Sequence, residues 1–430
     1  MKKEQEKMKM KDSGIEWIGK IPYNWELVRL QWNLDEIKEI NSPVKTNLVL
    51  SLTNKLGVIP YEEKGDLGNK AKESIEEYKV AYPNTIVVNS MNILIGSVGI
   101  CNYLGCVSPV YYVFKSKENS NLKFLNYIFQ TEQFQKELRK YANGILEIRL
   151  RVSSAGILKR SVAIPMIDIQ NRIVKTIENK TSIIDKLIRN EEHQIEKLKE
   201  YKQSLITEVV TKGLNKNVGM KDSGVEWIGK IPNGFNMVKV KHIGSCRNGL
   251  TYSPEEMCDE NGILVLRSSN IKDGKLVFDD NVYVSKSVKG DLIVNKGDIL
   301  ICSRNGSKNL IGKNAIVYDD LQCTFGAFMM IFRSIYNTEY IYYILNSSIF
   351  NYYLGSYLTS TINQLTTSNF DNMVIPFVYD IQEQIRIVDY LKEKCKEIDS
   401  IIDIKQKKIL KLNEYKKSLI YEYVTGKKEV

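Results

Sequence analysis

The side chains best suited to contact a polyanion lie in a stretch without acidic residues, 299–318. Its polar members are Ser303, Arg304, Asn305, Ser307, Lys308, Asn309, Lys313 and Asn314. Arginine and asparagine can form paired hydrogen bonds with base edges, whereas lysine supplies a compact charge for phosphates. A solvated basic face would have the same composition, so the stretch favours nucleic-acid binding only if a similar one occurs elsewhere.

A second such stretch, 148–167, is also free of acidic residues and contains Arg149, Arg151, Lys159 and Arg160. The loop "GSVGICNYLGCVS" from Gly96 adds small polar groups without charge. With a formal net charge of +10, the chain suits a polyanionic partner, and we predict double-stranded DNA. The predicted contacts are Ser51, Thr53, Asn54, Ser97, Asn102, Tyr103, Arg149 and Arg151 in the first half, and Arg267, Ser268, Asn270, Arg304, Asn305, Ser307, Lys308, Asn309 and Lys313 in the second.

Patterns that would support covalent chemistry are missing from the sequence. The two histidines, His193 and His242, are far apart, and none of the seven cysteines forms a C-x-x-C pair. No G-x-x-x-x-G-K-[ST] loop and no paired prolines of an amino-methyltransferase loop occur. We therefore expect no catalytic residue, no metal and no cofactor in this chain. Without a signal peptide or a membrane-length apolar run, we expect a cytoplasmic protein with reduced thiols and no membrane contact.

Two phrases recur and define the organisation of the chain. "MKDSGIEWIGKIP" from Met10 returns as "MKDSGVEWIGKIP" from Met220, with twelve of thirteen residues identical. "EYKQSLITEVVT" from Glu200 returns as "EYKKSLIYEYVT" from Glu414. Each half therefore consists of an opening phrase, a variable middle, an Ile-Pro and a long helix. Trp17 and Trp227 of the opening phrases are expected to dock where one half meets the end of the other half's helix, or else to fill their own domain's core.

The predicted long helices carry a heptad seam through five heptads. In the first it consists of Val174, Ile177, Thr181, Ile184, Ile188, Glu191, Ile195, Leu198, Lys202, Leu205 and Val209, and a shift of 214 residues gives its copy in the second. Two seams in one chain should pair, and an antiparallel pair would make the halves equivalent by a pseudo-two-fold axis. Glu191 and Lys405 occupy the same position of the repeat, so we expect them to meet and fix the register, unless both reach solvent. Gly213 and Gly426 are the expected helix stops.

The variable middles have the short β-branched runs and amphipathic stretches of mixed α/β domains. The expected domains are 1–163 and 214–374, and the expected spacer helices lie in 164–213 and 375–430. "LVLSLTNKLG" from Leu48 resembles "LVLRSSNIKDG" from Leu264. "NSMNILIGSVG" from Asn89 is expected to occupy the place of "NKGDILICSRNG" from Asn295. The fold class predicted is α+β: two mixed α/β domains in tandem repeat, joined by two long helices that pair as an antiparallel coiled coil.

These phrases, in this duplicated order over residues 10–426, resemble the specificity subunit of a type I restriction–modification system. The resemblance implies two target-recognition domains, each reading one half of a split DNA site, with the half-sites about one helical turn apart. It also implies partners: two methyltransferase subunits that use S-adenosylmethionine, and restriction subunits driven by ATP and Mg. "NSMNILIGSVG" lacks the Gly-Asp and Arg-Asn of the second domain, which leaves the first domain's contacts less defined.

Two other classes of function remain compatible with the sequence. A nuclease or methyltransferase with an unfamiliar site would show activity in the isolated chain. A non-DNA coiled-coil adaptor with two protein-binding domains would form complexes that are insensitive to salt and to DNA sequence.

Overall fold

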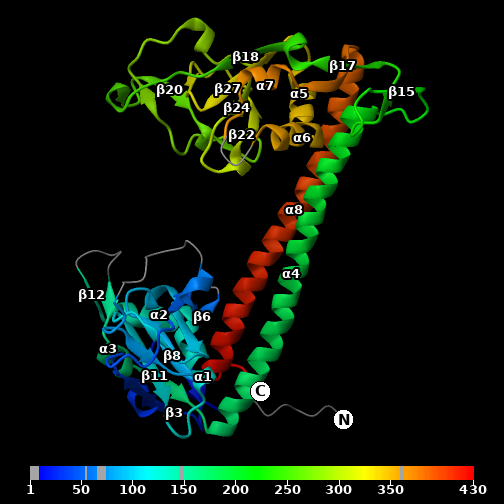
Figure 1. Ribbon diagram of the computed structural model, residues 1–430. Coiled ribbons are helices and arrows are strands. Elements are labelled where there is room, and N and C mark those ends of the chain that lie inside the picture. Colours follow the sequence, from blue (N-terminus) through cyan, green and yellow to red (C-terminus); the bar gives the residue numbers. More distant parts are fainter. Residues whose placement is uncertain (1–8, 54–55, 65–73, 145–149, 359–362) are drawn as a thin grey trace, which may run out of the picture. The chain divides into compact units, whose positions relative to one another are not determined.

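The computed structural model describes residues 9–53, 56–64, 74–144, 150–358 and 363–430 (Figure 1). The chain divides into two compact units. The first unit comprises Met1–Glu191 and Gln406–Val430, and the second comprises Glu192–Lys405. Each therefore contains part of both long helices, α4 (Ile167–Lys212) and α8 (Ile381–Val424).

The first unit is a mixed α/β domain built on the four-stranded antiparallel sheet β4–β11–β8–β9. Its helices are α1 (Leu122–Gln130), α2 (Glu132–Arg139) and α3 (Ser154–Leu158). Its strands are β1 (Met10–Asp12), β2 (Lys20–Pro22), β3 (Glu26–Arg29), β4 (Leu34–Ile37), β5 (Leu50–Thr53), β6 (Gly57–Pro60), β7 (Lys79–Ala81), β8 (Thr85–Asn89), β9 (Val98–Cys101), β10 (Gly105–Val107), β11 (Tyr111–Ser116), β12 (Ala142–Asn143), β13 (Arg151–Val152) and β14 (Ser161–Ile164).

The second unit repeats this sheet as β18–β27–β24–β25, also antiparallel. Its helices are α5 (Thr338–Leu345), α6 (Ser348–Tyr357) and α7 (Thr367–Asp371). Its strands are β15 (Met220–Asp222), β16 (Lys230–Pro232), β17 (Phe235–Lys239), β18 (Gly244–Asn248), β19 (Met257–Cys258), β20 (Ile263–Leu266), β21 (Ile271–Lys272), β22 (Lys275–Leu276), β23 (Tyr283–Val284), β24 (Ile299–Cys302), β25 (Asn314–Ile316), β26 (Thr324–Phe325), β27 (Met329–Ser334) and β28 (Val374–Val378).

The sheet register corrects one expected alignment of the two middles. Asn89 pairs with Tyr111 at the start of β11, and Cys302 pairs with Met329 at the start of β27. Asn89 therefore corresponds to Cys302 rather than to Asn295, and the expected alignment is wrong. The sequence comparison had matched "NILIG" with a strand because both are apolar runs. In the structure Ile93–Ile95 instead forms a 3-10 turn that closes at Gly96, which has a left-handed φ of 83°.

Each unit is fixed to a long helix by a buried glutamine. Gln170 and Gln384 are fully buried, and each accepts a hydrogen bond from the backbone of an asparagine that caps the first helix of its unit, Asn121 at 2.8 Å and Asn337 at 3.2 Å. Each also donates to a carbonyl of the preceding segment, at Pro165 and Val378. Buried amides require such partners, so the repeated glutamine fixes the start of each long helix against its domain.

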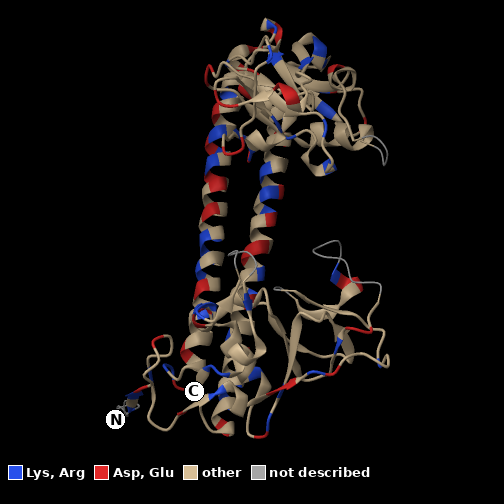
Figure 2. Ribbon diagram, turned by 90° about the vertical axis from the view of Figure 1, so that its left-hand side faces the viewer, with Lys and Arg blue, Asp and Glu red and all other residues tan. Residues whose placement is uncertain are grey.

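The two helices pair in antiparallel order inside each unit. In the first unit Asp185 of α4 binds Lys416 of α8, and Glu191 of α4 binds Lys408 of α8. The residue numbers rise along α4 and fall along α8, so the helices are antiparallel. In the second unit Lys405 donates to Gln194, and Lys202 binds Asp399. The seam residues of both helices are buried or half-buried, as the heptad pattern predicts. Positively and negatively charged residues are interspersed along both helices (Figure 2).

The residues predicted to set the register are both engaged across the helix pair. Glu191 is only 5% exposed and accepts from Lys408 at 2.6 Å, and Lys405 binds Gln194. Gly213 and Gly426 follow the two helices with φ of 68° and 71°, which confirms them as helix stops. The predicted fold class, with its tandem mixed domains and paired helices, is confirmed.

The two opening phrases form hairpins with different surroundings. In the first unit Trp17 packs on Phe134 of α2, and its carbonyl accepts from the Tyr421 hydroxyl of α8 at 2.8 Å. This hairpin meets the end of the other half's helix, as predicted. In the second unit Trp227 stacks on Tyr352 of α6, with ring centroids 4.2 Å apart. The second tryptophan therefore packs on a helix of its own domain.

Candidate nucleic-acid interface

The loop that follows β24 in the second unit spans residues 303–312 and starts from a rigid base. β24 is buried along its whole length, and the backbone N–H of Ser303 donates to the Phe328 carbonyl at 3.0 Å. The Ser303 carbonyl in turn accepts from Leu365 at 2.7 Å. Because three segments are tied together at this serine, the residue after it has a fixed backbone and a side chain that projects from the edge.

That next residue is Arg304, whose side chain is exposed. Its guanidinium lies over the ring of Phe328, 5.2 Å from the centroid, and its backbone forms an antiparallel bridge with Gln364. Among the described residues Arg304 forms no ion pair, so its charge and its fork of donors are not used by the domain itself. An aromatic face under an arginine holds the planar group without consuming its hydrogen bonds.

Asn305 connects the loop to a second segment. Its amide donates to the Ser268 hydroxyl at 3.2 Å, while its side-chain oxygen accepts from the backbone of Ser307 at 3.0 Å. Ser268 belongs to the 3-10 turn Ser268–Asn270 that follows β20. The structure therefore brings the two polar segments predicted for the second half to one edge.

The two lysines predicted for phosphates differ in their surroundings. Lys308 is exposed, as is Asn309 beside it, in the 3-10 turn Lys308–Leu310. Lys313 is half-buried, and its Nζ donates to the Ile271 carbonyl at 3.0 Å. Lys308 is therefore available to a ligand, whereas the ammonium group of Lys313 already donates a hydrogen bond within its own domain.

Two further predicted contacts are occupied by internal interactions. Arg267 forms an ion pair with Asp280 at 2.8 Å. Asn270 is fully buried, where it accepts from the Arg267 backbone and donates to Val277 and Asn281. The sequence could not distinguish these residues from free ones, because a polar residue that closes a turn has the same composition as one that contacts a ligand. Asn270 is a turn-closing residue in this fold and is not accessible as a contact.

The contacts predicted for the first half differ in their accessibility. Ser51 and Ser97 are buried, and the Thr53 hydroxyl donates to Gly57 in the β5–β6 hairpin. Asn102 is exposed and Tyr103 is half-buried, both in the β9–β10 turn. Arg151 is exposed on β13. Asn54 and Arg149 lie outside the described residues.

Sequence reasoning missed the segment of the first unit that corresponds to the arginine loop. Because Asn89 is equivalent to Cys302, the loop 90–96 takes the place of 303–312 and is three residues shorter. A usable signal was Asn84, which has a φ of 59° directly before β8, as Gly297 has a φ of 89° before Asp298 and β24. Asparagine and glycine are the residues that most readily take this conformation, so the two could have been matched.

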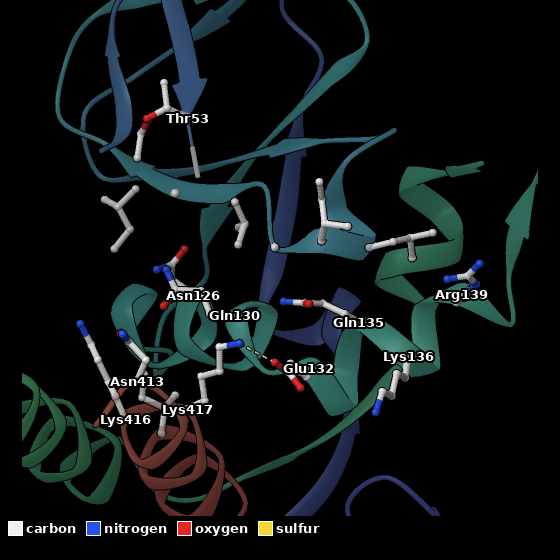
Figure 3. A pocket seen from close by; sticks show the side chains of 18 residues that line it. Thr53, Asn126, Gln130, Glu132, Gln135, Lys136, Arg139, Asn413, Lys416 and Lys417 are labelled. Atoms are coloured by element: carbon white, nitrogen blue, oxygen red, sulfur yellow. Dashed lines mark hydrogen bonds and ion pairs between the residues drawn. The ribbon is translucent and has the colours of Figure 1, made fainter. Parts of the chain in front are cut away.

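The loop 90–96 borders a cleft of about 800 Å³ in the first unit (Figure 3). Amide and cationic side chains from α1, α2 and α8 also line it: Gln130, Gln135, Lys136, Arg139, Asn413, Lys416 and Lys417. Glu132 is the one carboxylate of the lining, and Lys417 binds it at 2.6 Å, which lowers the pKa of that carboxyl. The cleft thus has an excess of positive charge and a supply of amide groups.

In the ranges that the structure describes, no group of three or more His, Cys, Asp or Glu is placed to hold a metal ion. No helix in those ranges is long and apolar enough to cross a membrane.

Comparison with known proteins shows what this chain is similar to. Residues 232–414 match the model of the type I restriction modification DNA specificity domain. The chain is 25% identical to the type I restriction enzyme MjaVIII specificity subunit of Methanocaldococcus jannaschii over 95% of this chain and 94% of that protein. It is 28% identical to the EcoKI specificity subunit of Escherichia coli K12 over 40% of this chain and 38% of that protein.

The fold is also shared with a solved structure. A chain from work on complex assembly and conformational transition of the type I R-M system superposes with a TM-score of 0.69, covering 94% of this chain and 98% of the other, at 14% identity. Together with the duplicated sequence, the domain match and the relative aligned along the whole chain make this protein similar to the specificity subunits of type I restriction–modification systems.

Proposed function

We propose that this protein recognises a bipartite DNA sequence, with each unit reading one half, and directs partner subunits to that site. The observation that carries the proposal is the arginine loop 303–312, which projects an unpaired guanidinium and an amide from a fixed strand end. Base edges in the major groove are read by such groups, and phosphates by point charges like that of Lys308. The basic cleft of the first unit offers the same chemistry to a second stretch of DNA.

The partners in this proposal are two methyltransferase subunits and restriction subunits. S-adenosylmethionine, ATP and Mg would be bound by those subunits, and this chain would supply sequence recognition without a catalytic residue of its own. The similarity to specificity subunits supports this division of labour, and each of the two long helices contributes a segment to both units.

Mapping of modified adenines tests the proposal directly. Genomic DNA from cells that carry the partner subunits should contain a split methylated motif when this chain is present and lose it when the chain is deleted. Purified alone, the chain should transfer no methyl group from S-adenosylmethionine to DNA. Methyl transfer by the isolated chain would favour an enzyme, and complexes insensitive to salt and sequence would favour a protein-binding adaptor.

A further inference from the structure

The edge that carries Arg304 in the second unit has a matching edge in the first. Ser303 donates to Phe328 and accepts from Leu365, and Ser90 donates to Val110 and accepts from Val152, through the same backbone atoms. The residue that donates to the serine carbonyl, Leu365 or Val152, is fully buried in each unit. Ser303 and Ser90 are therefore equivalent positions, and the residues on either side of these bonds can be compared one by one.

A second marker confirms the equivalence beyond this hydrogen bond. Ser153 caps α3 by accepting from Gly156, and Thr366 caps α7 by accepting from Asn369. Each cap directly follows its buried anchor and accepts from the residue three positions on. The segment around Val152 therefore matches the segment around Leu365 without a shift.

In this alignment the arginine lies on the segment after the serine in the second unit, and on the segment before the buried anchor in the first. In the second unit Arg304 follows the serine, and Gln364 precedes the buried anchor and bridges to it. In the first unit Met91 follows the serine, and Arg151 precedes the anchor. The amide two positions after the serine is kept, as Asn305 and Asn92. Each edge thus has one arginine and one asparagine, with the arginine on opposite segments in the two units.

The guanidinium of Arg151 is accessible to a ligand. Its side chain is exposed, and it forms no ion pair with any residue that the structure describes. Arg151 lies on β13, where its backbone pairs with Asn143 of β12 and directly precedes the buried Val152. The backbone of the next residue is fixed by Ser90. A fixed fork is suited to a base edge, whereas phosphate contacts also accept flexible lysines.

We infer that Arg151 is the specificity-determining arginine of the first unit, and that it contacts a guanine edge of duplex DNA as Arg304 does in the second. The inference rests on the proposed function and adds to it the residue that reads one base of the first half-site. Guanine presents two acceptors, O6 and N7, in the major groove, and the arginine fork matches both.

The test is a selection of sequences from a random duplex library by the purified full-length chain and by its variants. Arg151→Gln places in the first unit the residue that the second unit has at this position, and Arg172→Gln, exposed on α4, is the matched control. Arg151→Gln should relax the preference at one position of one half-site by about 5- to 150-fold and leave the other half-site unchanged. Arg304→Gln should do the same in the other half-site, and Arg172→Gln should change neither.

A charge-retaining variant separates base reading from phosphate binding. Arg151→Lys should lose the base preference but keep the affinity for unrelated DNA and the slope of log K against log salt. The inference is overturned if Arg151→Gln weakens all sequences equally with a smaller salt slope, if it affects both half-sites, or if a folded variant keeps the wild-type motif. If the wild-type chain selects no motif at all, the proposed function fails as well, and this arm reveals that before any variant is measured.

Discussion

The side chain of Gln384 holds the N–H of Asn337 at 3.2 Å through its oxygen, while its nitrogen donates to Val378 at 2.7 Å. One buried amide thus connects the first turn of α8, the cap of α5 and the end of β28. Gln170 makes the equivalent connections in the first unit. The pair of glutamines shows that the start of each long helix is fixed against its own domain in the same way.

Gln384→Leu should therefore destabilise the second unit. The substitution keeps the volume but leaves a buried N–H and a buried C=O without partners, which costs about 1–3 kcal/mol. Thermal unfolding of the full chain should show a lower transition for this variant. Gln382→Leu, at an exposed position two residues earlier, is the control and should shift the transition little. Equal stability of the two variants would show that the buried amide is not structurally important.

Glu191→Lys should destabilise the helix pair. The carboxylate is 5% exposed and accepts from Lys408, so the change places a second cation against that lysine in a poorly solvated position. Because the Lys408 side chain is 55% exposed, the cost should be smaller than for a fully buried pair, about 1–3 kcal/mol. Hydrogen exchange of the α4 amides around residue 191 should become faster, and Glu191→Lys combined with Lys408→Glu should recover part of the protection. A double variant no better than the single one would contradict the pairing.

Arg304→Ala and Lys308→Ala should have different effects on DNA binding. Loss of the arginine fork should cost about 1–3 kcal/mol on the cognate site and relax one base position. Loss of the lysine should weaken cognate and unrelated duplexes alike and reduce the salt slope by about one. Titrations at several salt concentrations against both duplexes distinguish the two effects. Unchanged cognate binding by a folded Arg304→Ala protein would place the reading surface elsewhere.

Asp371→Asn should stabilise the protein at neutral pH and not at acid pH. Burial raises the pKa of the Asp371 carboxyl, and its Oδ1 is buried without a hydrogen-bond partner in the described residues. A raised pKa means that the folded state prefers the protonated acid, so the ionised form lowers stability above that pKa. The melting temperature of the variant should exceed that of the wild type at pH 7, and the difference should shrink as the pH falls toward 4. A difference that grows at low pH would reverse the assigned sign.

Exchange of residues 233–379 for the middle of a related protein should change one half of the recognised sequence. This span keeps the β17–β28 pair intact, begins directly after Pro232 of β16 and ends before the start of α8. The incoming domain needs aromatic residues at the positions of Tyr352 and Tyr353, which pack on Trp227. Adenine mapping of the chimera gives the result, and a change in both halves would contradict independent reading.

The parts of the fold that periodicity encodes could be predicted from the sequence. The seam positions repeat every three or four residues, so both long helices and their pairing followed from apolar spacing alone. The match of Leu48 with Leu264 also holds, because Val49 and Val265 form parallel bridges to equivalent strand positions. These features depend on local sequence or recur in both halves, so each could be recognised within one half or by comparing the two halves.

The contact residues were less predictable because composition does not determine whether a polar side chain binds within its own domain or stays accessible. Lys308 and Lys313 lie five residues apart in one basic stretch, yet one is exposed and the other donates to Ile271. Met91 and Arg151 are sixty residues apart in the sequence, and only the sheet register shows that they replace Arg304 and Gln364. The shorter loop after β8 hid that relation, since "NILIG" forms a turn where a strand was expected.

The core of the first unit contains Leu419, Tyr423 and Val424 from the end of α8 beside Ile18 and Ile21 from the opening hairpin. During synthesis on the ribosome, the first unit cannot complete this core until residues 419–424 of α8 have been added. The apolar surface that these residues cover therefore stays exposed while residues 192–424 are translated. At about 5–20 residues per second, that interval is on the order of half a minute, so nascent-chain binding proteins have a long opportunity to act on the first unit.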